Sequence, residues 1–236
     1  MDISGLILAA GRGNRMGNLT NDQPKGFLKV GNKKLIDWQL DALFSNGIKE
    51  NSIVVGYKNE LFDFKVNYFH NRDWNKSNSV KSIMCANSLF EKKTVIVSYS
   101  DIIYDESIIK SLIEYDGRIV VPYTTNWLEI WEKRFKNPLD DAESFKIDEN
   151  GNIIEIGQSP SSIYEIQGQY LGILKITPDG WMDIKSILNN LDIKIINSLD
   201  ITGLLNLLIK NNFYVKSIKT NFSWFEFDSQ QDINVF

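Results

Sequence analysis

A glycine-rich segment with two arginines follows the first apolar run of the chain. The run spans residues 3–10 and ends in small residues, which is typical of a buried parallel strand that enters a tight loop. Glycines in such a loop let backbone N–H groups approach an anion without a Cβ atom in the way. The pattern predicts a phosphate-binding loop formed by Leu8, Ala9, Ala10, Gly11, Arg12, Gly13 and Arg15.

Two common glycine loops do not fit this segment. A dinucleotide fingerprint counted from its first glycine requires a third glycine where Met16 stands. A P-loop requires Gly-Lys-Ser/Thr after four spacer residues, and none follows. Lys25 lies a short distance beyond the loop and adds a third cation to its two arginines. Three cations beside a glycine loop suit a nucleoside triphosphate better than a nicotinamide cofactor.

Acidic residues occur at two places where they suit a metal ion. Asp101 follows a predicted strand at residues 94–97, and open α/β sheets bind ligands at the carboxyl ends of their strands. Glu226 and Asp228 lie on a predicted strand at residues 224–228, and their alternate spacing puts both side chains on one face. Mg²⁺ prefers hard oxygen ligands, commonly one or two carboxylates together with phosphate oxygens of the substrate. We expect Asp101 and Asp228 to hold Mg²⁺, with Glu226 assisting.

Strands and helices that alternate along the chain must position these residues. After the first strand, helices are expected at residues 35–44, 80–90 and 107–115, and strands at 52–56, 66–69, 94–97 and 118–121. Residues 144–148 and 153–156 flank Glu149-Asn150-Gly151 and predict a hairpin, and residues 169–176 predict another strand. Helices at 184–191 and 201–209 and strands at 214–219 and 224–228 complete the pattern. It predicts an α/β fold, a Rossmann-like three-layer sandwich with a mostly parallel mixed sheet and a small antiparallel insertion.

The composition excludes several classes of function. The net charge of −4 and the absence of a basic stretch argue against binding to a nucleic-acid backbone. Cys85 and His70 are the single residues of their types, so an internal disulfide, a thiolate zinc site and a catalytic scheme with several imidazoles do not fit. The sequence shows neither a signal-peptide pattern nor an apolar run near the ~18 residues of a membrane span. A cytoplasmic protein without membrane partners is expected.

The glycine loop and the segment around Lys25 resemble the signature of the nucleoside-diphospho-sugar pyrophosphorylase superfamily. Its members are nucleotidyltransferases with a GT-A-like fold. Residues 8–16 and Pro24-Lys25 carry the resemblance, and Gly26-Phe27-Leu28 continue it. Weaker matches follow in the same order at residues 78–82, 99–101, 168–172, 200–205 and 224–228, so the likeness spans nearly the whole chain. Within the superfamily the chain is most similar to the small bacterial cytidylyltransferases that activate phosphocholine, aminoalkylphosphonates and related acceptors, in part for cell-surface polysaccharides.

This resemblance implies a reaction and the residues that perform it. In the family, an acceptor phosphate attacks the α-phosphorus of the triphosphate in line, and pyrophosphate leaves without a covalent enzyme intermediate. Such a step requires positioning and charge neutralisation more than a protein base. Arg15 would hold the β- and γ-phosphates and Lys25 the α-phosphate or the incoming oxygen, with Mg²⁺ as the cofactor. The single Asp101, where many relatives carry an Asp-x-Asp or Gly-Asp pair, leaves the coordination of the metal open.

The resemblance favours CTP as the donor, and UTP or a purine triphosphate stays open. In the family the base is read by the first loop and by a segment that matches residues 78–82. The nucleotide-binding candidates outside the loop are Asn78, Ser79, Ser82 and Ser100. Asn and Ser side chains both donate and accept hydrogen bonds, but they are also common helix N-caps, so these residues do not select the base by themselves.

The acceptor is expected against the central insertion, which mixes aromatic residues with carboxylates. That mix can enclose a cationic amine. The candidates are Tyr123, Trp127, Trp131, Glu143, Glu165 and Tyr170. Two of the aromatics have the spacing of one helix face, which equally fits ordinary packing. Arg134 and Lys136 would instead suit an acceptor carboxylate or phosphate, and Asp200 and Thr202 are interpreted as a helix N-cap.

The whole chain, residues 1–236, is expected to form one nucleotidyltransferase domain, as a monomer or homodimer. Residues 1–122 would bind the nucleotide, 123–180 would form the acceptor side, and 181–236 would supply the second metal ligand. The main interpretation is CMP transfer from CTP to a small phosphorylated or phosphonate acceptor. A sugar-1-phosphate nucleotidyltransferase that uses UTP or another triphosphate is the alternative. A non-catalytic nucleotide-sensing relative would have lost Arg15, Lys25 or Asp101, and all three are present.

Overall fold

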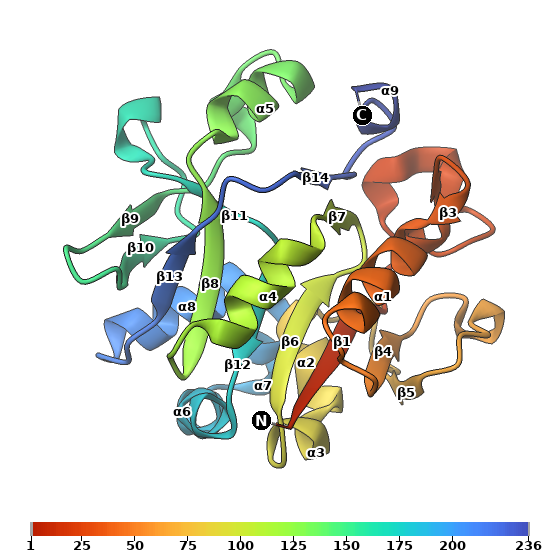
Figure 1. Cartoon of the computed structure of the whole chain (residues 1–236), viewed down its shortest axis with the longest axis horizontal. Coiled ribbons are helices and arrows are strands. Elements are labelled where there is room, and N and C mark those ends of the chain that lie inside the picture. The colour runs from red at the N-terminus through yellow and green to blue at the C-terminus, as the bar shows by residue number, and fades with distance from the viewer. Residues whose placement is uncertain (1, 236) are drawn as a thin grey trace.

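The computed structural model describes residues 2–235, and within them one eight-stranded sheet forms the centre of the protein (Figure 1). In spatial order its strands are β11 (Gln169–Tyr170), β8 (Ile119–Thr124), β12 (Ile173–Ile176), β6 (Thr94–Tyr99), β1 (Ile3–Ala9), β4 (Asn51–Val55) and β5 (Asn67–His70), and β13 (Lys216–Lys219) pairs with β8. Parallel pairing joins β6, β1, β4 and β5, and also β13 with β8. The strands β12 and β11 run antiparallel to their neighbours. The sheet is therefore mixed and mostly parallel, as the alternation of elements predicts.

Helices cover both faces of the sheet because the side chains of its inner strands are apolar on both sides. On β1, Leu6 and Leu8 face one cluster of buried residues and Ile7 and Ala9 face another. The first face packs against α2 (Ser79–Cys85), α3 (Asn87–Phe90), α6 (Pro178–Leu188), α7 (Ile193–Ser198) and α8 (Ile201–Lys210). The second packs against α1 (Leu35–Ser45) and α4 (Glu106–Glu114). These layers confirm the three-layer sandwich.

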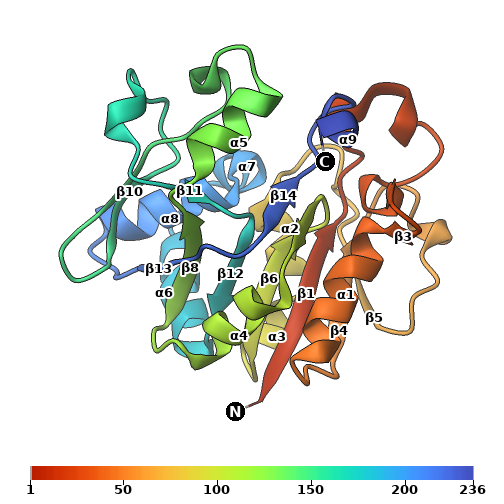
Figure 2. The same cartoon turned by 45° about the horizontal axis from the view of Figure 1, so that its top comes forward.

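The remaining elements lie mainly above the carboxyl ends of the parallel strands (Figure 2). They include the 3₁₀ segments η1 (Asn14–Thr20), η2 (Lys25–Phe27), η3 (Asn59–Leu61), η4 (Pro138–Asp140) and η5 (Ile163–Glu165), and the helices α5 (Trp127–Arg134) and α9 (Asp232–Val235). Two-stranded pairs are β2 (Lys29–Val30) with β3 (Lys33–Lys34), β9 (Phe145–Ile147) with β10 (Ile153–Ile156), and β7 (Ile102–Tyr104) with β14 (Trp224–Glu226). The β9–β10 pair confirms the predicted hairpin.

Several expected elements differ from the sequence prediction, among them the helix expected at residues 184–191, which spans Pro178–Leu188 as α6. The strand expected at residues 169–176 is split into β11 and β12, and the helix expected at 80–90 is split at Ala86 into α2 and α3. The strand expected at residues 118–121 continues through Pro122 to Thr124 as β8. Along one edge of β8, β12 pairs with Ile119 and Val120, and β11 pairs with Tyr123 and Thr124. Pro122 lies between these two paired stretches, so its missing N–H interrupts neither of them.

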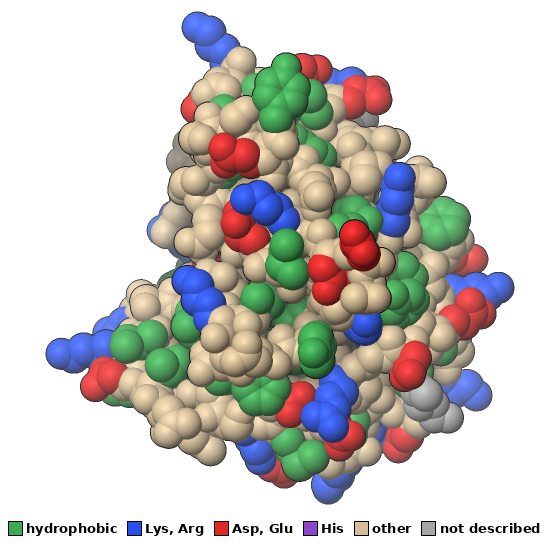
Figure 3. Space-filling model, turned by 90° about the vertical axis from the view of Figure 1, so that its left-hand side faces the viewer, with side chains coloured by type: hydrophobic (Ala, Val, Ile, Leu, Met, Phe, Trp, Pro, Cys, Tyr) green, Lys and Arg blue, Asp and Glu red, His purple; other side chains and the backbone are tan. Residues whose placement is uncertain are grey.

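The distribution of surface charge and the character of the helices can be described directly. On the face drawn in Figure 3, Lys and Arg side chains are scattered among Asp and Glu side chains rather than gathered in a stripe. Within residues 2–235, no helix combines the length and the apolar character that a bilayer crossing requires.

Candidate active site

The glycine loop is held beside Lys25 by close backbone packing. Gly13 has a φ of 74°, in the left-handed region, and a Cβ atom there would lie 2.8 Å from carbons of the Lys25 side chain. Any other residue at this position would therefore collide with Lys25 as well as strain the backbone. Met16 is fully buried beside Phe225 and Phe227, which anchors the loop against the C-terminal segment. The glycine at position 13 thus allows the loop to pack directly against the Lys25 side chain.

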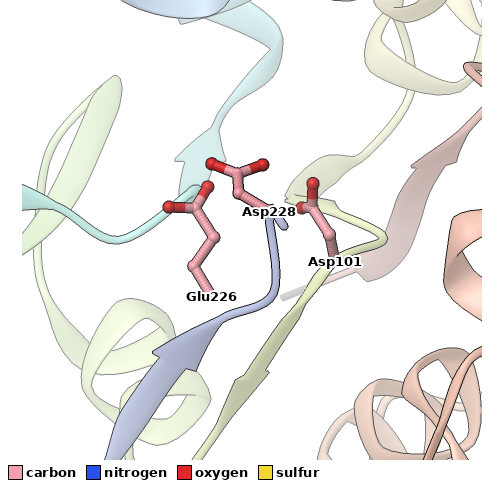
Figure 4. A group of neighbouring side chains, drawn as sticks. All are labelled: Asp101, Glu226 and Asp228. Carbon is pink, nitrogen blue, oxygen red and sulfur yellow. The ribbon is translucent and has the colours of Figure 1, made fainter. Parts of the chain in front are cut away.

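Three carboxylates from distant parts of the chain meet at the end of β6 (Figure 4). Asp101 follows β6, while Glu226 ends β14 and Asp228 comes two residues later. The antiparallel pair β7–β14 sets Glu226 opposite Ile102, and the Phe227 N–H donates to the Asp101 carbonyl oxygen at 2.8 Å. One oxygen from each carboxylate lies within 4.8 Å of the others. The predicted set of Asp101, Glu226 and Asp228 is therefore a single cluster.

The two predicted catalytic cations contact this cluster. The Lys25 ammonium donates to Asp101 Oδ2 at 2.6 Å and to Asp228 Oδ1 at 2.7 Å, and Arg15 reaches Asp228 at 2.9 Å. Burial opposes the charge of Lys25, but the two carboxylates outweigh it and raise the pKa of the ammonium. Burial likewise acts against the charge of Asp228, but its cationic neighbours lower the pKa of that carboxyl below its ordinary value. Lys25 and Asp228 are thus both charged at neutral pH.

Arg134 is a third cation at the cluster. From the sequence it was expected to contact a carboxylate or phosphate of the acceptor instead. Its side chain is fully buried, and its Nε donates to Asp232 at 2.8 Å. The same guanidinium lies 3.4 Å from Glu226 and 3.7 Å from Asp228. Asp232 in turn accepts from the backbone N–H of Asp228 at 2.9 Å, which orders the turn after β14. Arg134 is therefore a positioning residue for the carboxylates. Its place at the end of an amphipathic helix does not reveal that role in the sequence.

The residues present fit a divalent metal ion. Asp101 Oδ1 is buried and has no hydrogen-bond partner among the described residues, so this carboxylate has an oxygen available to a ligand. Burial, followed by the charges of Asp228 and Asp101, raises the pKa of Glu226, and the nearby Arg134 and Lys25 offset this only in part. Carboxylate oxygens are the ligands that Mg²⁺ prefers. A bound cation would satisfy the free oxygen and relieve the repulsion.

A first cavity of about 360 Å³ opens beside the glycine loop. Most of the predicted nucleotide-binding residues line it, namely Leu8, Ala10, Gly11, Gly13, Asn78, Ser79, Ser82 and Ser100, together with Arg15, Lys25 and Asp101. Ala9 points into the core on the opposite side of β1. Arg12 is turned away from the cavity lining, because its guanidinium donates to Asn21 and lies over the Tyr57 ring. Trp74, Ser77 and Tyr99 also line the cavity, and sequence reasoning did not single them out as site residues.

A second cavity of about 180 Å³ adjoins the first and shares Arg15 and Tyr99 with it. Five carboxylates line it, namely Asp141, Glu143, Asp200, Glu226 and Asp228. Its other side chains include Trp131, Gln169, Tyr170 and Thr202. The hydroxyl oxygen of Tyr170 is buried without a hydrogen-bond partner, so a ligand atom in this cavity would satisfy it. The two cavities meet where Asp228 and Lys25 lie.

Three residues that the sequence placed at the second cavity lie elsewhere. Tyr123 and Trp127 are buried in the hydrophobic core and line neither cavity. Trp127 instead packs edge-on against Trp131, the helix-face contact that their spacing allows. Glu165 bonds to Ser161 within its own loop. Trp131, Glu143 and Tyr170 do line the second cavity.

Glu143 and Asp200 form a pair of carboxylates at one side of the second cavity. The Thr202 hydroxyl lies 3.3 Å from Glu143 and 3.4 Å from Asp200, and it links them. Asp200 also accepts from the backbone N–H of Gly203 at 2.8 Å, so it caps α8 as the sequence suggests and still faces the cavity. Burial, followed by the charge of Asp200, raises the pKa of Glu143 to about 7.

Replacement of Glu143 with glutamine is expected to stabilise the protein at pH 8 and not at pH 4. The raised pKa means that the folded chain holds a proton which the unfolded chain releases, so stability falls as the pH rises from about 4.5 towards 7. Above that window the native enzyme carries an unfavourable buried charge near Asp200 and Asp141, and the glutamine variant does not. Urea unfolding of both proteins across this pH range measures the difference. A constant difference at every pH would contradict the argument.

Residues 5–148 match the family model of the MobA-like NTP transferase domain, so the chain belongs to this family of nucleotidyltransferases. It is 33% identical to the CTP:phosphoglutamine cytidylyltransferase of Campylobacter jejuni, over 99% of this chain and 98% of that one. It is 29% identical to the 2-aminoethylphosphonate cytidylyltransferase of Lancefieldella rimae, over 69% of this chain and 64% of that one.

A solved structure shows the same fold. The CTP:phosphocholine cytidylyltransferase of Streptococcus pneumoniae superposes with a TM-score of 0.72 at 18% identity, over 99% of this chain and 97% of that chain. These findings confirm the predicted superfamily and the expectation that the protein is a nucleotidyltransferase.

Proposed function

We propose that the protein transfers CMP from CTP to a small phosphorylated or phosphonate acceptor that carries a protonated amine, and releases pyrophosphate. The observation that carries the proposal is the junction of the two cavities, where Lys25, Asp101 and Asp228 lie in mutual contact. A donor in the first cavity and an acceptor in the second would meet at this junction. The cytoplasm, which holds free nucleoside triphosphates, is the compartment we assign to the reaction.

The related enzymes support CTP as the donor. Both curated relatives described above are named as cytidylyltransferases, one acting on phosphoglutamine and one on 2-aminoethylphosphonate. The first of them aligns with nearly the whole chain, including both cavities. An amino-acid phosphate is therefore the first acceptor to test.

The reaction is an in-line displacement at the α-phosphorus of CTP. An oxygen of the acceptor phosphate forms a new P–O bond, and the bond from the α-phosphorus to the bridging oxygen of pyrophosphate breaks. Because an ionised phosphate is already a nucleophile, no protein base is required, and the enzyme must position two anions and neutralise their charge. Lys25 lies at the junction to contact the α-phosphate, and Arg15 lines both cavities to contact the leaving pyrophosphate or the acceptor.

The carboxylate cluster would hold the magnesium ion that this class of reaction uses. Asp101 and Asp228 would bind it, with Glu226 assisting. When bound, the ion supplies positive charge to the phosphate oxygens of the donor and acceptor. The buried Arg134 guanidinium would hold Glu226 and Asp228 in place through its ion pairs with both carboxylates.

The second cavity suits a cationic group on the acceptor. Within the described part of the chain, Glu143 and Asp200 share the Thr202 hydroxyl, and neither forms an ion pair with a lysine or arginine. Two such carboxylates attract an ammonium group, and the free hydroxyl of Tyr170 adds a hydrogen-bonding group nearby. A neutral sugar would leave these charges without a partner, which disfavours a sugar 1-phosphate.

Pyrophosphate release in the presence of Mg²⁺ tests the proposal. The assay combines each of four nucleoside triphosphates with an amino-acid phosphate, 2-aminoethylphosphonate, phosphocholine and several sugar 1-phosphates. We expect release only with CTP and an amine-bearing acceptor, and a raised KM for that acceptor in a Glu143→Gln variant. Release with UTP and a sugar 1-phosphate would support the alternative enzyme. Binding of CTP without release from any pair would contradict catalysis and favour a nucleotide sensor.

A further inference from the structure

A tryptophan that the chemistry above does not use lies in the wall of the first cavity. Trp74 belongs to the loop between β5 and α2 and is only partly buried. It is absent from the lining of the second cavity, which has its own aromatic residues. Tyr99 also lines the first cavity but is shared with the second, and the rest of the lining includes charged groups near Lys25 and the hydroxyl groups of Ser77, Ser79 and Ser82. A large aromatic surface therefore faces the space reserved for the donor nucleotide.

The position of this ring is fixed by its contacts with the loop after β4. A Cβ atom on Gly56 would lie 2.6 Å from the Trp74 Cβ and 2.8 Å from the Ala10 carbonyl oxygen, so only glycine allows Trp74 to approach the glycine loop this closely. The ring centroid lies 5.2 Å from that of Tyr57. The Tyr57 hydroxyl donates to the carbonyl oxygen of Thr20 at 3.0 Å, which connects the aromatic pair to the segment after the glycine loop.

A buried asparagine holds the loop that carries Trp74. Asn71 is 2% exposed, its Oδ1 accepts from the Asp73 N–H at 3.0 Å, and its Nδ2 donates to the Ser77 and Ser82 hydroxyls at 3.1 Å each. The Ser77 hydroxyl donates to the Asp73 carbonyl oxygen at 2.8 Å. These bonds close the loop on both sides of Trp74 and join it to α2, so the ring is held in place before any ligand binds.

We infer that Trp74 stacks on the base of the donor nucleotide and that residues 71–77 form an element of the base-binding site. This inference rests on the proposed function, because it takes the first cavity as the donor site. The phosphates belong beside the glycine loop and Lys25, which leaves the base to the part of the cavity lined by Trp74, Ser77, Asn78 and Ser82. The ring supplies affinity, while the amide and hydroxyl groups face the polar edge of the base.

Removal of the ring is expected to weaken nucleotide binding, and a smaller ring should retain it. Loss of one base–aromatic stack lowers affinity by about 5- to 100-fold, so Trp74→Ala should bind CTP and CMP weaker by that factor. Trp74→Phe should bind both within about threefold of the native protein, since phenylalanine also stacks. Neither variant should bind inorganic tripolyphosphate differently, because that ligand has no base. Titration calorimetry measures the three ligands without an acceptor.

Intrinsic fluorescence provides a second readout. CTP should quench part of the tryptophan emission of the native protein, and the Trp74→Phe variant should lose that quench while it still binds. Trp38→Phe is the matched control, because Trp38 lies on α1, donates to the Val30 carbonyl oxygen and lines neither cavity. The quench should persist in that variant.

The outcomes separate the inference from the proposed function. Native-like CTP affinity in Trp74→Ala, or a quench that survives in Trp74→Phe, would overturn the stacking while CMP transfer stands. Equal weakening of CTP and tripolyphosphate would also overturn it, since the residue would then only support the loop. If the native protein binds no nucleoside triphosphate, the proposed function fails and takes the inference with it.

Discussion

Replacement of Lys25 with alanine is expected to lower kcat by about 10²- to 10³-fold, the usual cost of losing one preorganised charge at a developing anion. Lys25 is the cation in contact with both Asp101 and Asp228 at the junction of the two cavities. Arg15 and Arg134 also contact Asp228, but neither pairs with Asp101, so they do not bridge the two carboxylates as Lys25 does. Steady-state rates at saturating CTP and acceptor measure the loss.

The same substitution should also destabilise the protein in the absence of metal. From the sequence alone, Lys25→Ala is expected to leave the fold intact, but the structure shows that Lys25 balances two carboxylates in the interior. Removal of one partner from a buried ion pair commonly costs about 3–5 kcal/mol. Mg²⁺ should restore part of this stability, because it binds the folded carboxylate cluster and adds the missing charge. Urea unfolding with and without Mg²⁺ gives both values.

Lys33→Ala is the matched control for these measurements. Lys33 pairs with Asp41 on the surface, and an exposed pair of this kind contributes about 0–1 kcal/mol. Its removal should change neither kcat nor the response to Mg²⁺. A near-native kcat in Lys25→Ala would remove this residue from the reaction, and native stability without Mg²⁺ would contradict its role as the balancing charge.

Replacement of Asp101 with asparagine is expected to abolish turnover at millimolar Mg²⁺. The change removes one negative charge and one carboxylate oxygen from the cluster with Glu226 and Asp228, while the size of the side chain stays the same. A neutral amide is a poor ligand for Mg²⁺ compared with a carboxylate. The fold should survive, because Asp228 still pairs with Lys25.

Metal binding gives a readout of Asp101→Asn that does not depend on turnover. Mg²⁺ should raise the unfolding temperature of the native protein and have little effect on this variant. Asp63→Asn, an exposed position outside both cavities, should respond to Mg²⁺ as the native protein does. Full activity of Asp101→Asn at the native Mg²⁺ concentration would place the metal elsewhere.

The local parts of the site could be predicted because their signals lie within a few residues of each other. The apolar run of β1 followed by glycines indicates a buried strand and a tight loop, and the same reasoning places Asp101 at the end of β6. The carboxyl ends of parallel strands lie at one edge of a sheet, so the loop and the aspartate were expected on the same side. Errors occur where a local pattern has two readings, as at Tyr123 and Trp127, whose aromatic rings fill the core.

The sequence by itself therefore determined the fold class, the glycine loop with Lys25 and the types of residue proposed to bind phosphate and metal. Only the tertiary structure decided how Glu226 and Asp228 reach Asp101, since the pairing of β7 with β14 joins segments more than a hundred residues apart. It also decided that Arg134 lies behind the carboxylates, that Glu143 meets Asp200, and that Trp74 faces the first cavity. The physical reason is that hydrogen bonding and apolar periodicity form each element locally, whereas contacts between elements depend on how the whole core packs.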